Sequence, residues 1–505
     1  MRKNLFLVSG LLAATLFTAC NNEEISMPQG DNEASQELVL ALSDGSLNMA
    51  RSSNAFARAA KAAGIGDAGA INAFGRPLYS SMAAQDIQNI KIYFVHENNT
   101  IAHIVNVDET HWKQSLAYQN GRKLLISLKK KDLGGEYLDG KYQVYAVAYS
   151  TKHGYDAFTP ALDAVKVGDT WSEFSASVLE TSDPSEIFAG QSEVTASASN
   201  VTLTPTAGKG EAMVTLYRQL AGVSGYFTNI PVKPLGETPT HLRLVASGKN
   251  TVADFVLLEK NVGDDETIKQ TNYVVNGKTP AATKDANYFI TNTEGYVVYE
   301  IDLNKWFNND FAGADKDGDG FVGYKDVVNG GVAGTATWTN PNANVNNHVQ
   351  GLVKGSVWGG KFVIPFAQST GVPTFQLQLV KKSADGTTVE LLKHWNIKLT
   401  QDDLHKATGV QLPTGVTAAV AGDESVEVYN IYRNHMYSIG KKSFDNVDPN
   451  KPVDPGVDPN KPVNPDKPTE PTDPDKNEPG DLSKGQDLTI HVNSNWEAVH
   501  NMEID

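Results

Sequence analysis

The stretch ELVLAL, residues 37–42, carries large apolar side chains at every second position, namely Leu38, Leu40 and Leu42. Alternation with period two is typical of a β-strand with one buried face. Glycine, asparagine, aspartate and proline separate further apolar runs, as expected of turns. These runs lie at residues 90–95, 142–149, 212–218, 242–247, 296–301, 374–380 and 426–432. The sequence therefore predicts an all-β fold with minor helix, mainly NAFARAAKAA at residues 54–63.

The composition limits the classes of function. The 505 residues carry a formal net charge of −16, and lysine and arginine are scattered, which disfavours a nucleic-acid partner. Neither G-x-S-x-G nor H-E-x-x-H occurs, and we expect no enzymatic activity. Four tryptophans could stack on sugars, but packing in a sheet core is the favoured interpretation. They are Trp306, Trp338, Trp358 and Trp395.

The first twenty residues have the pattern of a secretory signal. A short basic start is followed by an apolar run at residues 5–17, which is too short to span a membrane as a helix. The sequence FTAC at residues 17–20 resembles a bacterial lipobox, whose cysteine receives lipid after cleavage. Cys20 is the only cysteine. We therefore expect a lipid anchor at Cys20 and a fold that no disulfide stabilises.

Two arginines follow the first predicted strand. Residues 43–56, SDGSLNMARSSNAF, have the composition of an exposed loop, the kind of segment that proteases cut. A cut after Arg51, or as second choice after Arg58, would separate strand 37–42 from the rest of the chain. Two solvated arginines beside the start of a helix remain the alternative interpretation.

A proline-rich tether precedes the end of the chain. Ten prolines lie between Pro449 and Pro479, and VDPNKPV occurs at residues 447–453 and again at 457–463. Such a composition cannot bury a core and favours an extended polyproline II chain, with a reach of up to roughly 95 Å at ~3.1 Å per residue.

The closing sequence QDLTIHVNSNWEAVH, residues 486–500, predicts one more strand. Leu488, Ile490 and Val492 alternate with polar residues, yet no other strand is near in sequence. Addition to the sheet of another molecule is the favoured interpretation, because a single strand needs partners. Docking onto the chain's own domain remains open, although a return normally takes only a short loop.

The sequence DKDGDGFVGYKD at residues 315–326 matches a calcium-binding loop. Carboxylates stand at loop positions 1, 3, 5 and 12, Gly320 provides the turn at position 6, and Phe321 offers its carbonyl at position 7. The predicted ligands are Asp315, Asp317, Asp319, Phe321 and Asp326. Aspartate at position 12 is shorter than the usual glutamate, so we expect a structural Ca²⁺ of modest affinity; an acidic surface turn is the alternative.

Several segments, in order along the chain, resemble a fimbrillin, the type V pilus subunit of Gram-negative anaerobes. They are LVLALSDGSLNMARSSNAF (38–56), VYAVAYS (144–150), EIFAGQ (186–191), YRQLAGV (217–223), YNIYRNHMYSI (429–439) and LTIHVNSNWEAV (488–499). The most specific element combines Arg433, Asn434, His435 and Tyr437 with a linker and a strand ending at Trp496.

The resemblance implies a lipoprotein precursor with two transthyretin-like β-sandwich domains. In such proteins a trypsin-like protease removes the leading strand, and a strand from one subunit fills the groove of the next. For this chain it implies cleavage at Arg51, a donor strand containing Leu488, Ile490, Val492 and Trp496, and a polymer with copies of itself and accessory pilins. The precursor would be anchored to the outer membrane and the mature protein would lie in surface fimbriae.

The resulting division of the chain has six parts. They are a signal peptide (1–20), a propeptide with the leading strand (21–51), an N-terminal sandwich (52–219), a C-terminal sandwich with the calcium loop (220–445), a Pro/Asp-rich linker (446–485) and the donor strand (486–505). The expected function is that of a fimbrial shaft subunit that supports adhesion. The alternatives are a monomeric glycan-binding surface lipoprotein and a pilus tip adhesin.

Overall fold

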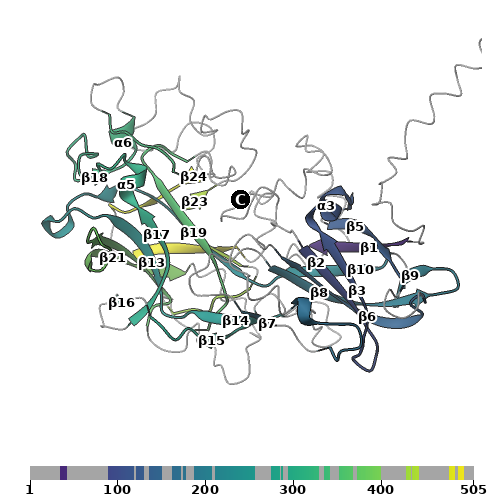
Figure 1. Ribbon diagram of the computed structural model, residues 1–505. Helices are drawn as coiled ribbons and strands as arrows, with labels where there is room; N and C mark the ends of the chain where they lie inside the picture. Colours follow the sequence, from purple (N-terminus) through teal and green to yellow (C-terminus); the bar gives the residue numbers. More distant parts are fainter. Residues whose placement is uncertain are drawn as a thin grey trace, which may run out of the picture.

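The computed structural model describes two large groups of strands, which Figure 1 shows side by side. The described residues are 35–42, 89–118, 121–129, 136–149, 162–171, 175–177, 187–206, 211–255, 274–284, 286–287, 294–328, 335–341, 352–367, 372–399, 428–433, 435–442, 477–483 and 487–493. Within these ranges strands far outnumber helices, which confirms the predicted all-β fold with minor helix.

The first group is a nine-stranded sheet within the described residues. Its order is β3 (Ile101–Asp108), β2 (Asn89–Val95), β6 (Gly140–Tyr149), β8 (Ile187–Ser197), β10 (Met213–Arg218), β1 (Ser35–Leu42), β5 (Gly121–Ser127) and β4 (Leu116–Tyr118), with β9 (Thr202–Pro205) paired to β8. Helix α3 (Glu109–Gln114) follows β3 and is capped by the carboxylate of Asp108.

The sheet folds over on itself around one core. Side chains of β2, β6 and β8 meet those of β1, β5 and β10 in a single apolar cluster, so the sheet forms the two layers of a sandwich. Leu38 and Leu40 of β1 belong to this cluster and are 0 % exposed. β1, the first of the described strands, is therefore an interior part of the first domain's core.

The second group is a ten-stranded sheet within the described residues. Its order is β16 (Ala286–Asn287), β17 (Glu294–Asp302), β13 (His241–Ala246), β20 (Phe375–Lys382), β21 (Val389–Leu399), β26 (Asp487–Asn493), β22 (Met436–Ile439), β11 (Ala221–Thr228) and β19 (Val357–Val363), with β25 (Gly480–Asp481) paired to β11. Its two ends approach each other, because Tyr299 and Ile301 of β17 pack against Gly359 of β19.

The second sheet begins directly after the first one ends. Strand β10 ends at Arg218, and β11 begins at Ala221 in the other sheet. Gly222 and Gly225 lie inside β11, which is buried along its whole length. At Gly225 a Cβ atom would come within 2.3 Å of Phe227 and of the Tyr299 hydroxyl, so close packing requires a glycine there.

Small elements complete the second group and link it to the first. β12 (Ile230–Pro231) pairs with β18 (Phe321–Val322), and β23 (Lys441–Lys442) pairs with β24 (Asn477–Glu478). β14 (Asn250–Asp254) pairs with β15 (Gly277–Pro280) and also with β7 (Ser175–Ser177), which precedes β10 in sequence. The short helices are η1 (Pro234–Gly236), α5 (Leu303–Trp306) and α6 (Tyr324–Val327). A strand from between β6 and β8 thus pairs with β14 in a separate three-stranded sheet, β15-β14-β7.

Two sequence interpretations need correction. The run at residues 426–432 is not a strand over its described part, 428–432, although Tyr429 and Ile431 are buried. Their N–H groups donate to Thr374 Oγ1 and Phe366 O, so the alternation reflects burial without a strand ladder. Residues 477–483, which the prediction placed in the linker, include β24 and β25, and Leu482 is 0 % exposed.

Candidate functional site

The first candidate site is the slot that β1 occupies. β1 lies between β10, to which it is parallel, and β5, to which it is antiparallel. Seven register pairs join it to β5 and four join it to β10. An interior strand supplies hydrogen-bond partners to both neighbours, so without β1 both β5 and β10 would present an open edge.

The side chains of β1 add an apolar contribution to the same slot. Leu38, Val39 and Leu40 are each 0 % exposed. At about 1.5–3 kcal/mol for each fully buried side chain, these three contribute on the order of 5–9 kcal/mol of gross burial. Removing β1 would therefore expose an apolar groove together with unpaired backbone groups.

The second candidate site is the slot of β26, the predicted closing strand. It lies between β21, to which it is parallel, and β22, to which it is antiparallel. Its register partners at positions 488, 490 and 492 are Ile397, Leu399, Ile439 and Tyr437, all of them buried in the second core. In this single chain the closing strand completes the chain's own second sheet, the alternative that the sequence left open.

β1 and β26 have the same kind of surroundings. Each is an interior strand with one parallel and one antiparallel neighbour. Each is also distant in sequence from the two strands between which it lies. The other predicted processing and donor positions lie outside the described residues: Cys20, Arg51, Arg58 and Trp496.

The Arg433, His435 and Tyr437 motif lies where the two groups of strands meet; Asn434 is outside the described residues. The guanidinium of Arg433 lies 5.2 Å from the centre of the Tyr217 ring on β10, and His435 Nδ1 lies 2.7 Å from Arg433 O. The N–H of Gly222 donates to His435 O. The motif therefore holds the start of β11 against the end of β10.

Sequence reasoning gave no role to Arg218, which belongs to the same junction. Arg218 is 2 % exposed, and its guanidinium lies 4.9 Å from the centre of the Phe188 ring. The neighbouring Gln219 carbonyl accepts a hydrogen bond from Asn276 Nδ2. The only signal was the position of Arg218 within YRQLAGV, because an arginine at the end of a strand otherwise suggests solvent.

Burial lowers the pKa of His435 to about 4, and the positive charge of Arg433 acts in the same direction. The hydrogen bond to the Arg433 carbonyl opposes this shift. His435 is therefore neutral at physiological pH and serves as a packed hydrogen-bonding group, and no acid–base role follows from its position.

The third candidate site is the acidic loop at residues 315–326. One carboxylate oxygen each of Asp315, Asp317 and Asp326 lies within 4.8 Å of the others. Asp326 is buried and accepts hydrogen bonds from the N–H groups of Lys316 and Gly323 at 2.7 and 2.8 Å. Gly318 and Gly320 have φ of 76° and 89°, the left-handed conformation that favours glycine.

Electrostatics in the loop favour a cation. Burial raises the pKa of Asp326 and that of Asp319, and in Asp319 the carboxylates of Asp317 and Asp315 raise it further. A hard divalent ion with oxygen ligands would offset this repulsion, so the donor set fits Ca²⁺. Asp319 is outside the group of three close carboxylates, and Phe321 begins β18 opposite Pro231. The structure thus brings three of the four predicted carboxylates together.

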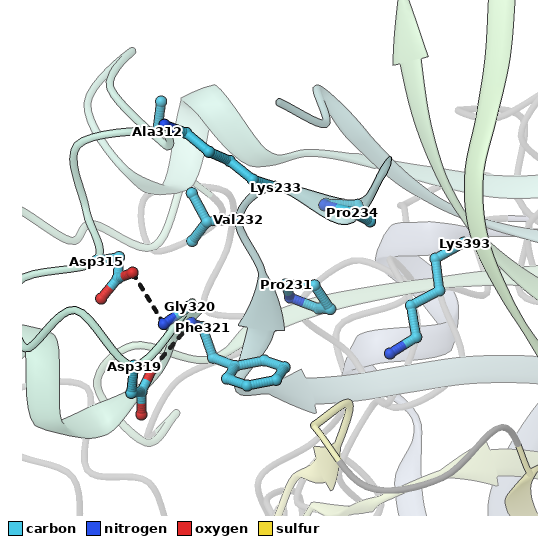
Figure 2. Close-up of a pocket in the computed structure, with 10 residues that line it drawn as sticks. All are labelled: Pro231, Val232, Lys233, Pro234, Ala312, Asp315, Asp319, Gly320, Phe321 and Lys393. Carbon is cyan, nitrogen blue, oxygen red and sulfur yellow. Dashed lines mark hydrogen bonds between the residues drawn. The ribbon is translucent and has the colours of Figure 1, made fainter. Parts of the chain in front are cut away.

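A cavity of about 650 Å³ opens beside this loop, between the loop and the strand that precedes η1. Figure 2 shows Asp315 and Asp319 on one side and Lys393 on the other, with Pro231 and Phe321 between them. The Lys393 ammonium lies 4.8 Å from the centre of the Trp395 ring, and burial lowers the pKa of Lys393.

Comparison with known proteins gives no family by sequence: no family model matches this chain, and no curated protein does. Solved structures do match. They include fimbrial and adhesion proteins and a protein described as polysaccharide-binding. The tip fimbrial protein Mfa3 from Porphyromonas gingivalis shares 10 % identity over 80 % of this chain and 94 % of its own, with a TM-score of 0.30.

Two further matches have similar values. A fimbrial assembly protein from Parabacteroides distasonis shares 12 % identity over 71 % of this chain and 98 % of its own, with a TM-score of 0.26. A provisionally named cell adhesion protein from Bacteroides eggerthii shares 12 % identity over 92 % and 97 %, with a TM-score of 0.33. Because these TM-scores lie below 0.5, the likeness supports no inference about this chain, and its own strands carry the proposal below.

None of the helices in the described ranges has the length and apolar character that a membrane span needs.

Proposed function

We propose that this chain is a fimbrial shaft subunit that polymerises by strand donation and supports adhesion. The observation that carries the proposal is the position of β1. It is an interior strand of the first sheet, yet Arg51 lies between it and β2, the next described strand. A single cut after Arg51 therefore removes the covalent connection of β1 to the sheet that it completes.

The vacancy left by β1 suits a strand from another molecule. Filling it would restore hydrogen bonds to β5 and β10 and rebury the apolar groove in one step. A strand held by both neighbours dissociates slowly, which would give the polymer kinetic stability. Until the cut, β1 itself blocks the slot and keeps the precursor monomeric.

β26 is the proposed donor. In its own sheet it has four register pairs with each neighbour, whereas the β1 slot offers seven and four. The vacated slot therefore presents a longer ladder than the one that β26 occupies, which favours transfer to a neighbouring copy once β1 has gone. The proline-rich segment at residues 449–474, between β23 and β24, adds length to the span that the tail crosses.

The remaining partners follow from the sequence. A trypsin-like protease would cut after Arg51, lipid at Cys20 would anchor the precursor to the outer membrane, and the mature chain would join accessory pilins at the cell surface. Loss of residues 21–51 with the lipid would free the mature subunit from the membrane.

A pilus tip adhesin is the second candidate, and the position of β26 in its own sheet favours it. A tip subunit needs to accept a strand but does not need to donate one, so its closing strand can stay in its own sheet. The two candidates differ in one outcome: a shaft subunit extends a fibre made of identical copies, and a tip subunit ends it.

The acidic loop is proposed as a structural Ca²⁺ site with ligands from Asp315, Asp317, Asp326 and, on the same loop, Asp319 and the Phe321 carbonyl. α5 precedes the loop, and α6 contains its last ligand, Asp326. Each helix is only four residues long, so the loop lacks the long flanking helices of a calcium sensor. By ordering the loop, the ion would stabilise the pairing of β18, which belongs to the loop, with β12.

The test of the proposed function is polymerisation after a specific cut. The chain from residue 21, with a protease site at residue 51, should form a ladder of oligomers that survives denaturing gels once it is cut. The same chain ending at residue 485 should form none. A cut chain that stays monomeric at high concentration would refute strand donation.

A further inference from the structure

The inference concerns the outward-facing side of β1. Val39 points away from the core that Leu38 and Leu40 enter, yet it is 0 % exposed. Its register partners are Lys123 on β5 and Met213 on β10. Leu125 and Met213, on the two neighbouring strands, are 39 % and 41 % exposed, so burial of Val39 is not a general property of this face.

An ion pair crosses β1 at this point. Lys123 Nζ contacts Glu211 Oε1, and the two residues come from opposite sides of β1. Neighbouring strands lie about 4.7–4.9 Å apart, so a pair that joins the second neighbours must pass over the strand between them. Lys123 is directly opposite Val39, and Glu211 precedes Met213 by two residues. We call this pair the clasp.

The clasp restricts what can stand at position 39. A residue at this position should be compact and uncharged, because Val39 is 0 % exposed here and a charged side chain opposite Lys123 would compete with the ion pair. Valine meets both conditions. A carboxylate would lie next to that of Glu211, and a large ring would push the two charges apart.

β26 can replace β1 in its slot in three registers that keep the apolar residues of β26 on the core side. In the first register Leu488 takes the place of Leu38, and Thr489 takes that of Val39. A shift of two residues in either direction puts Asp487 or His491 in the place of Val39. Apolar alternation does not separate these registers, since residues 488, 490 and 492 are all apolar. Threonine has the size and the branching of valine, and it is the only one of the three that fits beneath the clasp.

We infer that the β1 slot accepts β26 of a second copy with Thr489 beneath the Lys123–Glu211 ion pair, which sets the register. This inference rests on the proposed function. Leu488 and Ile490 then take the positions of Leu38 and Leu40, and Asp487 takes that of another acid, Glu37. β26 already runs between one parallel and one antiparallel neighbour in its own sheet, the same arrangement that it would meet here.

Cysteine cross-linking measures the register. Cys20 is the only native cysteine and lies in the segment before residue 21, so a chain from residue 21 has none. The acceptor is this chain with Thr215→Cys, which is opposite position 41 of β1, cut after Arg51. The donors are uncut chains with His491→Cys, Thr489→Cys or Asn493→Cys, which can donate but cannot accept. They report Thr489, Asp487 or His491 at position 39, respectively, and leave that residue unchanged.

His491→Cys should form the disulfide with Thr215→Cys at least tenfold faster than either other donor, as followed on non-reducing gels and by mass spectrometry. Equal or faster reaction of Thr489→Cys or Asn493→Cys overturns the register while strand donation stands. Complexes without any of the three cross-links also overturn it. Absence of any complex overturns the proposed function and the register together.

The clasp is tested separately. Lys123→Met in the acceptor should reduce the preference for His491→Cys to less than about threefold, because Asp487 or His491 at position 39 would no longer meet a closed ion pair. The matched control is Lys91→Met, which removes the Lys91–Asp163 ion pair on β2 in the same sheet. If Lys123→Met leaves the preference at its original value, the clasp does not set the register.

Discussion

Replacing Leu40 by alanine should weaken the precursor and leave the mature polymer unchanged. Leu40 is 0 % exposed and belongs to the first core, and deleting a buried leucine side chain costs about 2–5 kcal/mol. With an m value of about 1–3 kcal/mol per molar urea, this loss lowers the urea midpoint of the first domain by roughly 1–2 M. The reason for the contrast is that β1 is absent from the mature sheet.

The assay compares urea unfolding before and after the cut at residue 51, followed by hydrogen exchange at β5 and β10, the two strands that flank β1. Leu244→Ala is the matched control: Leu244 is also 0 % exposed but lies on β13 in the second core, so it should lower the midpoint in both forms. If Leu40→Ala weakens the cut, polymerised protein as much as the precursor, β1 has stayed in its slot and the reasoning is wrong.

Three further predictions follow from single residues. Asp317→Asn keeps the acceptor for the Asp319 N–H but removes a negative charge, so the Ca²⁺ affinity measured by calorimetry should fall at least tenfold. The control Asp254→Asn, which removes the ion pair with Lys278, should leave the affinity unchanged. If Asp317→Asn binds Ca²⁺ as tightly as the unchanged protein, Asp317 is not a ligand. The pKa of an unfolded histidine is near 6.5, whereas that of the folded His435 is about 4. The free energy of unfolding should therefore fall by about 3 kcal/mol as the pH drops from the first value to the second, because only the unfolded state takes up the proton. His435→Gln should abolish that loss. Gly190→Ala should destabilise the first domain by about 1–3 kcal/mol, because its Cβ would lie 1.8 Å from the Thr215 carbonyl oxygen; an unchanged urea midpoint would contradict the strand packing.

Alternating apolar residues predicted most of the strands that define the fold, because a half-buried strand leaves a period of two in the sequence. The run at residues 37–42 corresponds to β1, and that at 142–149 to β6. The same signal failed at residues 426–432, where Tyr429 and Ile431 are buried but their backbone groups bond to a side chain and to a loop carbonyl.

Periodicity identifies which face of a strand is buried but not which sheet buries it. Leu488, Ile490 and Val492 predicted β26, and nothing in their order pointed to β21 and β22 as neighbours. The sequence also does not show why Gly225 is needed in β11, because the residue that it packs against, Tyr299, lies seventy-four residues later along the chain. The sequence likewise does not predict the clasp, because Lys123 and Glu211 are far apart in the chain and come together only where β1 lies between β5 and β10.

The acidic loop was predicted in more detail because all its residues are local in sequence. Glycines at positive φ and carboxylates at fixed spacing specify the turn without help from the rest of the fold. The one departure, Asp319 outside the closest group of carboxylates, concerns side-chain direction, which spacing does not determine.

The measurement that tests strand donation most directly mixes two forms of the chain. The acceptor is cut after Arg51 and carries Ile490→Asp, so that it cannot donate, and the donor is uncut with a native tail. We predict a one-to-one complex that survives denaturing gels without heating, with hydrogen exchange at β5 and β10 of the acceptor slowed to the level of the precursor. No complex, together with residues 487–493 of the donor still protected in their own sheet, would contradict the account.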